Sequence, residues 1–176
     1  HFGSQVYEWK FLAPEIGIDY YSGSPVEQNY NFDDPQSIPE AKLKSRFSSF
    51  TFSLAPKLKF GDQEAALVII PKYNFGNISS RGDHLVYNGN LYALEERSKY
   101  SEPASFWSFA AGIEGDFLGT GYLWFSLLLK YSLLDSENAL HSLDFSDQRI
   151  RPVGGSSSGI GIGFRVYVDI ISIFKE

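Results

Sequence analysis

Apolar and polar residues alternate with a period of two in six segments of the chain, which is the pattern of β-strands with two different faces. The segments are 12–21, 50–60, 65–76, 105–117, 122–133 and 159–174. In the second segment, for example, Phe50, Phe52 and Leu54 alternate with Thr51 and Ser53. The alternation predicts six strands, each with one apolar face and one polar face.

The connections between these strands alternate between short and long. Gly61-Asp62-Gln63 and Gly119-Thr120-Gly121 are short and contain the residues of tight hairpin turns. The long, polar connections are 22–46, 77–104 and 134–157. Short turns at one end and long loops at the other are typical of outer-membrane barrels. Inside the second long connection, Asn88-Gly89 lies between short apolar runs and predicts a hairpin that extends beyond the membrane.

Composition agrees with an all-β chain and excludes several classes of protein. The 176 residues suit one domain, 1–176, and aromatic residues make up 16% of them. No stretch approaches the roughly 20 apolar residues of a membrane helix. The absence of Cys excludes disulfides and Cys-based metal sites, and the net charge of −6 argues against nucleic acid as a partner. The chain contains no Met, so we expect a mature chain whose export signal has been removed, although a trimmed chain would look the same.

The polar face has the composition of the inside of a narrow barrel. It is rich in Gly, Ala and Ser, which fit where side chains converge. It also carries equal numbers of acids and bases, although the whole chain is acidic. Buried charges need partners, so we expect these side chains to form an interior network of paired charges. The residues of this predicted network are Glu15, Asp19, Lys57, Lys59, Lys72, Glu114, Asp116, Lys130, Arg165 and Asp169.

The apolar face has the composition of a surface that meets lipid. It is almost free of charge, and a Lys or Arg there would cost about 2–4 kcal/mol at the middle of a bilayer. Aromatic residues lie toward the ends of the strands, where interfacial girdles are found in membrane proteins. These residues are Tyr20, Tyr73, Phe75, Trp107 and Tyr131.

The last strand reads Gly159-Ile160-Gly161-Ile162-Gly163-Phe164-Arg165-Val166-Tyr167-Val168 and resembles the terminal strand of outer-membrane proteins. Together with the loop asymmetry, it makes the chain similar to small barrels of the OmpA/OmpX-like class, and its Tyr- and Asn-rich loops are similar to those of Bacteroidota barrels. The resemblance implies an up-and-down antiparallel transmembrane β-barrel of about eight strands in the bacterial outer membrane. Six strands are visible, and the missing pair could come from 5–11 and the hairpin near 84–95, or from segments outside the given sequence, or the barrel could be completed by other chains.

The resemblance also implies a function and a set of partners. We expect a small non-enzymatic barrel with a plugged interior, which is a structural or accessory subunit of an envelope complex. Its surroundings would be outer-membrane lipid and lipopolysaccharide, its partners other outer-membrane proteins, and it would need no cofactor or metal ion. Two alternatives stay open: a soluble lipocalin-like barrel that binds an apolar ligand, and a barrel enzyme that modifies lipid A.

Three loop features could carry chemistry. The pattern typical of barrel deacylases is a His and a Ser two residues apart on a strand. Here His141 and Ser142 are adjacent and lie in a predicted loop. His84 also lies in a predicted loop, and His1 is terminal. Arg81-Gly82-Asp83 matches an integrin-binding tripeptide but is also a good turn sequence. Six acids in the loops could bind lipopolysaccharide through divalent cations, although a solvated rim is the simpler interpretation. These acids are Asp33, Asp34, Asp135, Glu137, Asp144 and Asp147.

Overall fold

The computed structural model describes residues 2–6, 9–32, 38–62, 64–120, 123–153 and 158–168 of the chain. Nearly all of the regular structure in these ranges is β-strand. The elements are β1 (Phe2–Gln5), β2 (Leu12–Ser22), β3 (Val26–Tyr30), β4 (Ala41–Gly61), β5 (Ala66–Tyr87), β6 (Tyr92–Gly115), β7 (Leu123–Ser132), α1 (Glu137–His141) and β8 (Gly159–Val168). The prediction of an all-β chain is confirmed. No helix in the described ranges is long and apolar enough to cross a bilayer.

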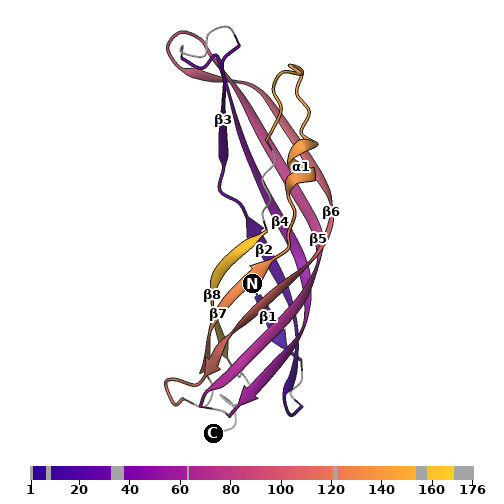
Figure 1. Cartoon of the computed structure of the whole chain (residues 1–176), viewed down its shortest axis with the longest axis vertical. Helices are drawn as coiled ribbons and strands as arrows, with labels where there is room; N and C mark the ends of the chain where they lie inside the picture. Colours follow the sequence, from indigo (N-terminus) through magenta and orange to yellow (C-terminus); the bar gives the residue numbers. More distant parts are fainter. Residues whose placement is uncertain are drawn as a thin grey trace.

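The strands form one antiparallel sheet, in which β1, β2, β4, β5, β6, β7 and β8 lie side by side in that order (Figure 1). β3 stands outside this path and pairs with the first residues of β4. Each of the six predicted strands has its counterpart in the described residues, while residue 122 of the fifth and residues 169–174 of the sixth lie outside them. Their order in the sheet follows their order in the chain, as the short turns and hairpins predicted.

The predicted loop 77–104 is wrong in its extent, because β5 and β6 run through it to a turn at residues 88–91. The outward face of the strands is polar there and the inward face mixes buried apolar and polar residues, such as Ile78 and Ser80, so the apolar–polar alternation that marks the other strands is missing. Ser79 and Ser101, for instance, are paired across β5 and β6 and share a hydrogen bond of 3.0 Å between their hydroxyls. The predicted turn at Asn88-Gly89 is confirmed, with Gly89 at a φ of +94° that favours glycine.

The structure gives no additional strand over residues 9–11 or 84–95, while Gln5 ends β1 and residues 7–8 of the predicted segment 5–11 lie outside the described residues. The additional strands are β1 at the N-terminal edge and β3 inside the predicted loop 22–46. Residues 84–95 belong instead to the ends of β5 and β6. β3 is short, and its residues do not alternate between apolar and polar types. The apolar–polar pattern of the sequence therefore did not predict it.

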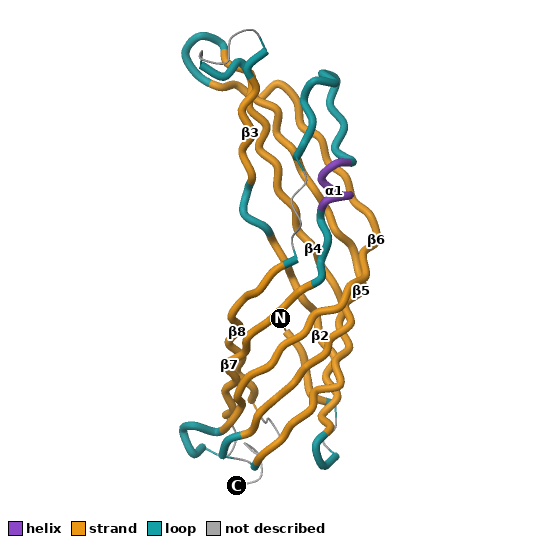
Figure 2. The backbone as a smooth tube through the Cα atoms, viewed as in Figure 1, coloured by secondary structure: helices purple, strands orange, loops and turns teal. Residues whose placement is uncertain are grey.

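The lower half of the sheet, which includes β7 and β8, curls so that its two edges approach each other (Figure 2). β2 and β8 are far apart in the order of the sheet, yet Arg165 of β8 reaches Glu15 of β2 across the hollow. Among the described residues no hydrogen-bonded ladder joins β8 to β1. The coarse fold is therefore a strongly curled antiparallel sheet, and its closure into a barrel stays a prediction.

The upper half has an ordinary apolar core. There β3, β4, β5 and β6 continue beyond the other strands, and α1 with the chain that follows it lies along them (Figure 1). Leu43 of β4 packs with Leu140, Leu143, Phe145 and Ile150 of this segment. The core keeps the long connection between β7 and β8 folded against the sheet.

Candidate functional site

The polar face of the curled sheet is buried, and most of the predicted charge network lies on it. Six of its residues are no more than 7% exposed: Glu15, Asp19, Lys57, Lys72, Glu114 and Arg165. Lys59, Asp116 and Lys130 are half-buried. Asp169 lies outside the described residues. Asp116 follows the last residue of β6, whereas the other described residues of the predicted network lie in strands.

A first group of charges, which we call the lower cluster, consists of Glu15, Lys57, Glu114, Arg165 and Tyr167. Lys57 Nζ lies 3.0 Å from Oε1 of Glu15 and 3.1 Å from Oε1 of Glu114. Arg165 Nη1 donates to Oε2 of Glu15 over 2.8 Å. Tyr167 donates its hydroxyl proton to Oε1 of Glu15 over 2.9 Å. The cluster thus links β2, β4, β6 and β8 through charged hydrogen bonds.

Two other side chains extend the lower cluster. Ser126 of β7 donates to Oε2 of Glu114 over 2.8 Å. Lys59 Nζ lies 3.7 Å from Oε1 of Glu114 and 4.3 Å from the centre of the Trp124 ring, in position for a cation–π contact. Every strand from β2 through β8 on the main path except β5 contributes a side chain here.

A second group, the upper cluster, consists of Asp19, Lys72, Asn74, Tyr21 and Ser108. Lys72 Nζ lies 2.6 Å from Oδ1 of Asp19. Asn74 is fully buried, donates to Ser108 Oγ over 3.0 Å and accepts from the Tyr21 hydroxyl over 3.2 Å. Sequence patterning placed these polar residues on one face, but it gave no indication that Asn74 connects three strands.

Burial gives these contacts their energetic weight. Removing one partner of a buried ion pair typically destabilises a protein by about 3–5 kcal/mol, because the other charge is left without compensation. A network in which most groups have partners also specifies one arrangement of strands. The two clusters therefore fix the curl of the sheet.

The opposite face of the curled sheet is apolar and exposed. We call this surface the apolar belt. Its residues include Ile16, Ile18, Tyr20, Phe50, Phe52, Leu54, Phe60, Leu67, Ile69, Tyr73, Phe75, Trp107, Phe109, Ile113, Leu127, Leu129, Tyr131, Ile160, Ile162, Phe164 and Val166, each at least 36% exposed. A soluble monomer seldom exposes a contiguous apolar surface of this kind unless it meets a partner or a membrane.

The belt has a sharp upper boundary. On β5 the outward residues change from Phe75 to Asn77, and on β6 they change from Trp107 to Ser105. Aromatic rings form a line at this boundary. Phe52 stacks on Phe75 with ring centroids 5.9 Å apart. Tyr73 and Trp107 are 5.2 Å apart and continue the line from β5 to β6.

Arg81-Gly82-Asp83 lies within β5, and not in a loop as predicted. Its two charged side chains bind each other, with Arg81 Nη2 3.1 Å from Asp83 Oδ2. Arg97 of β6 adds a second ion pair to Asp83 at 2.6 Å. Partial burial would raise the pKa of Asp83, but the hydrogen bonds from both arginines outweigh it and hold the pKa below its ordinary value.

The histidines lie apart from one another. His84 is on β5, 5% exposed and against the ring of Phe145, so its predicted place in a loop is wrong. His141 ends α1, and Ser142 is the C-cap residue that follows it. His1 lies outside the described residues. Within the described ranges, no three His, Cys, Asp or Glu side chains are grouped so that they could hold a metal ion.

The loop acids are spread along the segment between β7 and β8. Asp135 bonds the backbone N–H of Glu137 over 2.9 Å, ahead of α1. Asp144 is exposed, and Asp147 pairs with Arg149 at 2.8 Å. Asp33 and Asp34 lie outside the described residues. Asp135 and Asp147 thus bond within their own segment, which gives these two acids a local structural role.

Comparisons with protein-family models, curated proteins and solved structures found no match to this chain.

Proposed function

We propose that this chain is a small outer-membrane β-barrel, in which the curled sheet closes and the apolar belt faces lipid. The observation that carries the proposal is the inverted distribution of side chains. Lys57 is 1% exposed inside the curl, while Leu54, three residues earlier on the same strand, is 51% exposed. In water the exposed apolar face would be unfavourable, whereas in a bilayer it is favourable, and the charges lie on the enclosed face away from lipid.

The height of the belt fits a membrane. On β4 it runs from Phe50 to Phe60. Ten residue steps of about 3.4 Å, at the strand tilt of about 40° common in such barrels, span a height of about 26 Å. Transmembrane barrels carry an apolar band about 25 Å tall between aromatic girdles. The aromatic line through Phe52, Phe75 and Trp107 is the upper girdle in this proposal.

The upper half, whose outer surface is polar, would lie outside the membrane. Beyond the aromatic line the outward side chains of β4 to β6 include many charged and hydroxyl-bearing ones, such as Lys44, Ser79 and Lys99. Long extensions lie on the external side of known barrels, and short turns lie on the periplasmic side. We therefore place α1 and the hairpin at Asn88-Gly89 outside the cell, near lipopolysaccharide.

We propose a structural or accessory role without catalysis. The lower cluster fills the curl with paired side chains, which supports a plugged interior better than an open channel. The soluble lipocalin-like alternative requires an apolar interior and an outer surface that carries the charges. The described residues have the reverse arrangement, which favours the membrane barrel. The position of His141 at the end of a short helix gives no support to a lipid A-modifying enzyme.

Fractionation of cells that export the chain tests the proposal. We expect the protein in the outer-membrane fraction, resistant to washing with high salt and released only by detergent. It should also migrate differently in gels before and after heating, because a closed barrel resists unfolding by detergent. Recovery of the folded protein in the soluble fraction without detergent would disprove the membrane location.

A further inference from the structure

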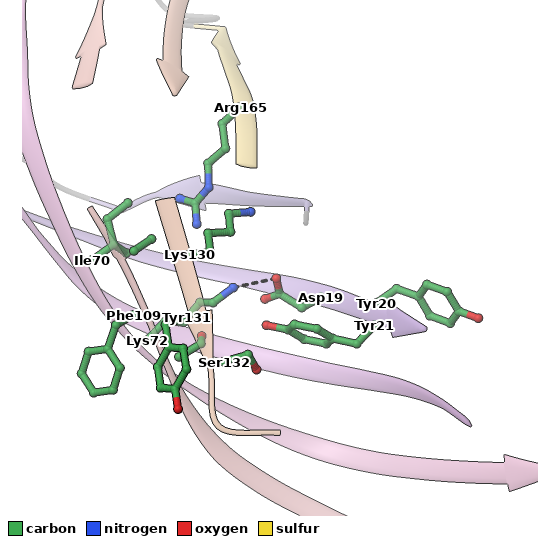
Figure 3. A pocket seen from close by; sticks show the side chains of 12 residues that line it. Asp19, Tyr20, Tyr21, Ile70, Lys72, Phe109, Lys130, Tyr131, Ser132 and Arg165 are labelled. Carbon is green, nitrogen blue, oxygen red and sulfur yellow. Dashed lines mark hydrogen bonds and ion pairs between the residues drawn. The ribbon is translucent and has the colours of Figure 1, made fainter. Parts of the chain in front are cut away.

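A cavity of about 230 Å³ lies on the buried face, beside the upper cluster (Figure 3). A cavity needs only about 10–15 Å³ to hold one water molecule, so this one has room for a small ligand. Asp19 of β2, Lys72 of β5, Lys130 of β7 and Arg165 of β8 border it. The cavity is therefore enclosed by strands from both sides of the curl.

The charges around the cavity do not balance. Three cations border it, Lys72, Lys130 and Arg165, against the one carboxylate of Asp19. Lys72 uses that carboxylate at 2.6 Å. Arg165 directs its Nη1 to Glu15, while its buried Nε has no hydrogen-bond partner among the described residues. Donors therefore remain that no described acceptor satisfies.

Of the three cations at the cavity, Lys130 has no counter-ion among the described residues. The charges that act on it are Arg165 and Lys72, which repel it, and Asp19, which is already paired. No carboxylate in the described part of the chain lies within ion-pair distance of its ammonium group. A half-buried charge in this position would be stabilised by an anion from outside the chain.

Gly163 gives Lys130 its position. A Cβ at Gly163 would lie 2.1 Å from Lys130 Cε and 2.6 Å from its Nζ, so any larger residue would displace the lysine. Gly161 lies two residues earlier on the same face of β8, and a Cβ there would meet nothing within 4 Å. The space beside Lys130 thus requires a glycine at position 163 but not at position 161.

We propose that this cavity is a binding site for a small oxyanion, with phosphate as its best probe. Lys130 Nζ, Arg165 Nε and the remaining N–H groups of Lys72 would donate to the oxygen atoms of the anion. Charge-assisted hydrogen bonds of this kind are the strong ones in proteins. The site goes beyond the proposed membrane function and does not depend on it, because the sheet itself brings the four strands together.

Calorimetric titration of the purified full chain with inorganic phosphate, in a zwitterionic detergent and at constant ionic strength, tests the proposal. We expect saturable binding of one phosphate per chain, and no comparable heat from chloride. A second titration uses a short-chain phosphatidic acid, which carries the same phosphate group on a lipid. The enclosed position predicts that only the free ion binds.

Variants locate the site. Lys130→Gln should weaken phosphate binding at least about tenfold, since it removes a charge-assisted hydrogen bond. Lys130→Arg should retain most of the affinity. Gly163→Ala should weaken binding while Gly161→Ala leaves it unchanged. Lys99→Gln removes an exposed cation from the outward face of β6 and controls for the loss of one positive charge.

Three results would overturn the proposal. One is a phosphate titration of the wild-type chain that matches chloride. Another is unchanged affinity in Lys130→Gln, or an equal loss in Lys99→Gln. The third is binding of the lipid phosphate alone. If Lys130→Gln does not fold, the comparison of Gly163→Ala with Gly161→Ala decides the question.

Discussion

Arg165 Nη1 donates a hydrogen bond of 2.8 Å to Oε2 of Glu15, although the two residues are 150 positions apart in the chain. Their side chains are 6% and 3% exposed. The bond joins β8 to β2 across the hollow of the sheet. Together with the hydrogen bond from the Tyr167 hydroxyl to Glu15, it opposes opening of the curl, because both connect strands with no shared ladder.

Arg165→Met should therefore destabilise the fold strongly. The substitution leaves Glu15 buried with only Lys57 as a cationic partner, and loss of one member of a buried pair typically costs about 3–5 kcal/mol. Urea unfolding in detergent micelles would measure the change in the free energy of unfolding. Lys99→Met, at an exposed position, should change it by less than about 0.5 kcal/mol.

A double-variant cycle separates this pair from general packing. Glu15→Gln combined with Arg165→Met should cost less than the sum of the two single changes, because each single change leaves an uncompensated partner. Additive costs would show that the two side chains do not interact in solution.

Leu54→Lys tests the environment of the apolar belt. Leu54 is 51% exposed and lies across from Tyr73 on β5. At the middle of a bilayer the lysine should cost about 2–4 kcal/mol. At an equally exposed site in water it should cost less than about 0.5 kcal/mol. Unfolding from lipid vesicles measures the difference.

Asn77→Lys is the matched control for that substitution. Asn77 is exposed on the outward face of β5, just beyond the aromatic line. We expect almost no effect there. Equal effects of Leu54→Lys and Asn77→Lys would mean that the belt and the polar surface above it meet the same solvent.

The sequence predicted the strands of the belt because the exposed face requires apolar residues and the buried face holds polar ones, so that residue types alternate along each strand. Phe50 to Phe60 had to alternate if one face was exposed apolar surface and the other held charges. The same reasoning placed Lys57 and Glu114 on the buried face, where the structure has them. It also identified the turn at Asn88-Gly89, because type I′ turns need residues that accept positive φ.

The sequence did not predict which of the buried charged side chains pair with one another. Alternation says which face a lysine occupies, but the pairing of Lys57 with both Glu15 and Glu114 depends on the curl of the sheet. Likewise, β3 and the upper parts of β5 and β6 have polar residues on their outward faces and gave no periodic signal. The burial of Gly82 beneath Phe145 depends on a loop that packs back onto the sheet.

Gly82→Val should release the segment after α1 from the sheet. A Cβ at Gly82 would lie 2.7 Å from Cζ of Phe145 and 3.2 Å from Cδ1 of Leu143. A branched side chain cannot fit without moving both residues, so the apolar core of the upper half should open locally. Trypsin should then cut after Arg149, which precedes Ile150, several times faster than in the wild-type chain.

Ser79→Val is the control for the protease experiment. Ser79 lies on the outward face of the same strand, so the change adds the same side chain without touching the core. Its cleavage rate should match that of the wild type. Equal protection of the segment in Gly82→Val would contradict the packing of Phe145 over Gly82.

The contact between Asp147 and Arg149 predicts an unusually acidic carboxyl group outside the proposed membrane region. Hydrogen bonds from the Arg149 side chain, aided by its backbone N–H, lower the pKa of Asp147 from 3.8 to about 2. Because the pKa is depressed in the folded chain, the stability that this contact contributes is present above about pH 3.8 and is lost as the pH falls through about 2.

Carboxyl ¹³C chemical shifts measured against pH would test this directly. The Asp147 midpoint should lie near 2 in the wild-type chain and return toward 3.8 in Arg149→Gln. Arg151→Gln should leave it unchanged, since Arg151 donates its Nε hydrogen to the carbonyl oxygen of Gln148 instead. A wild-type midpoint near 3.8 would mean that Arg149 does not hold Asp147 in solution.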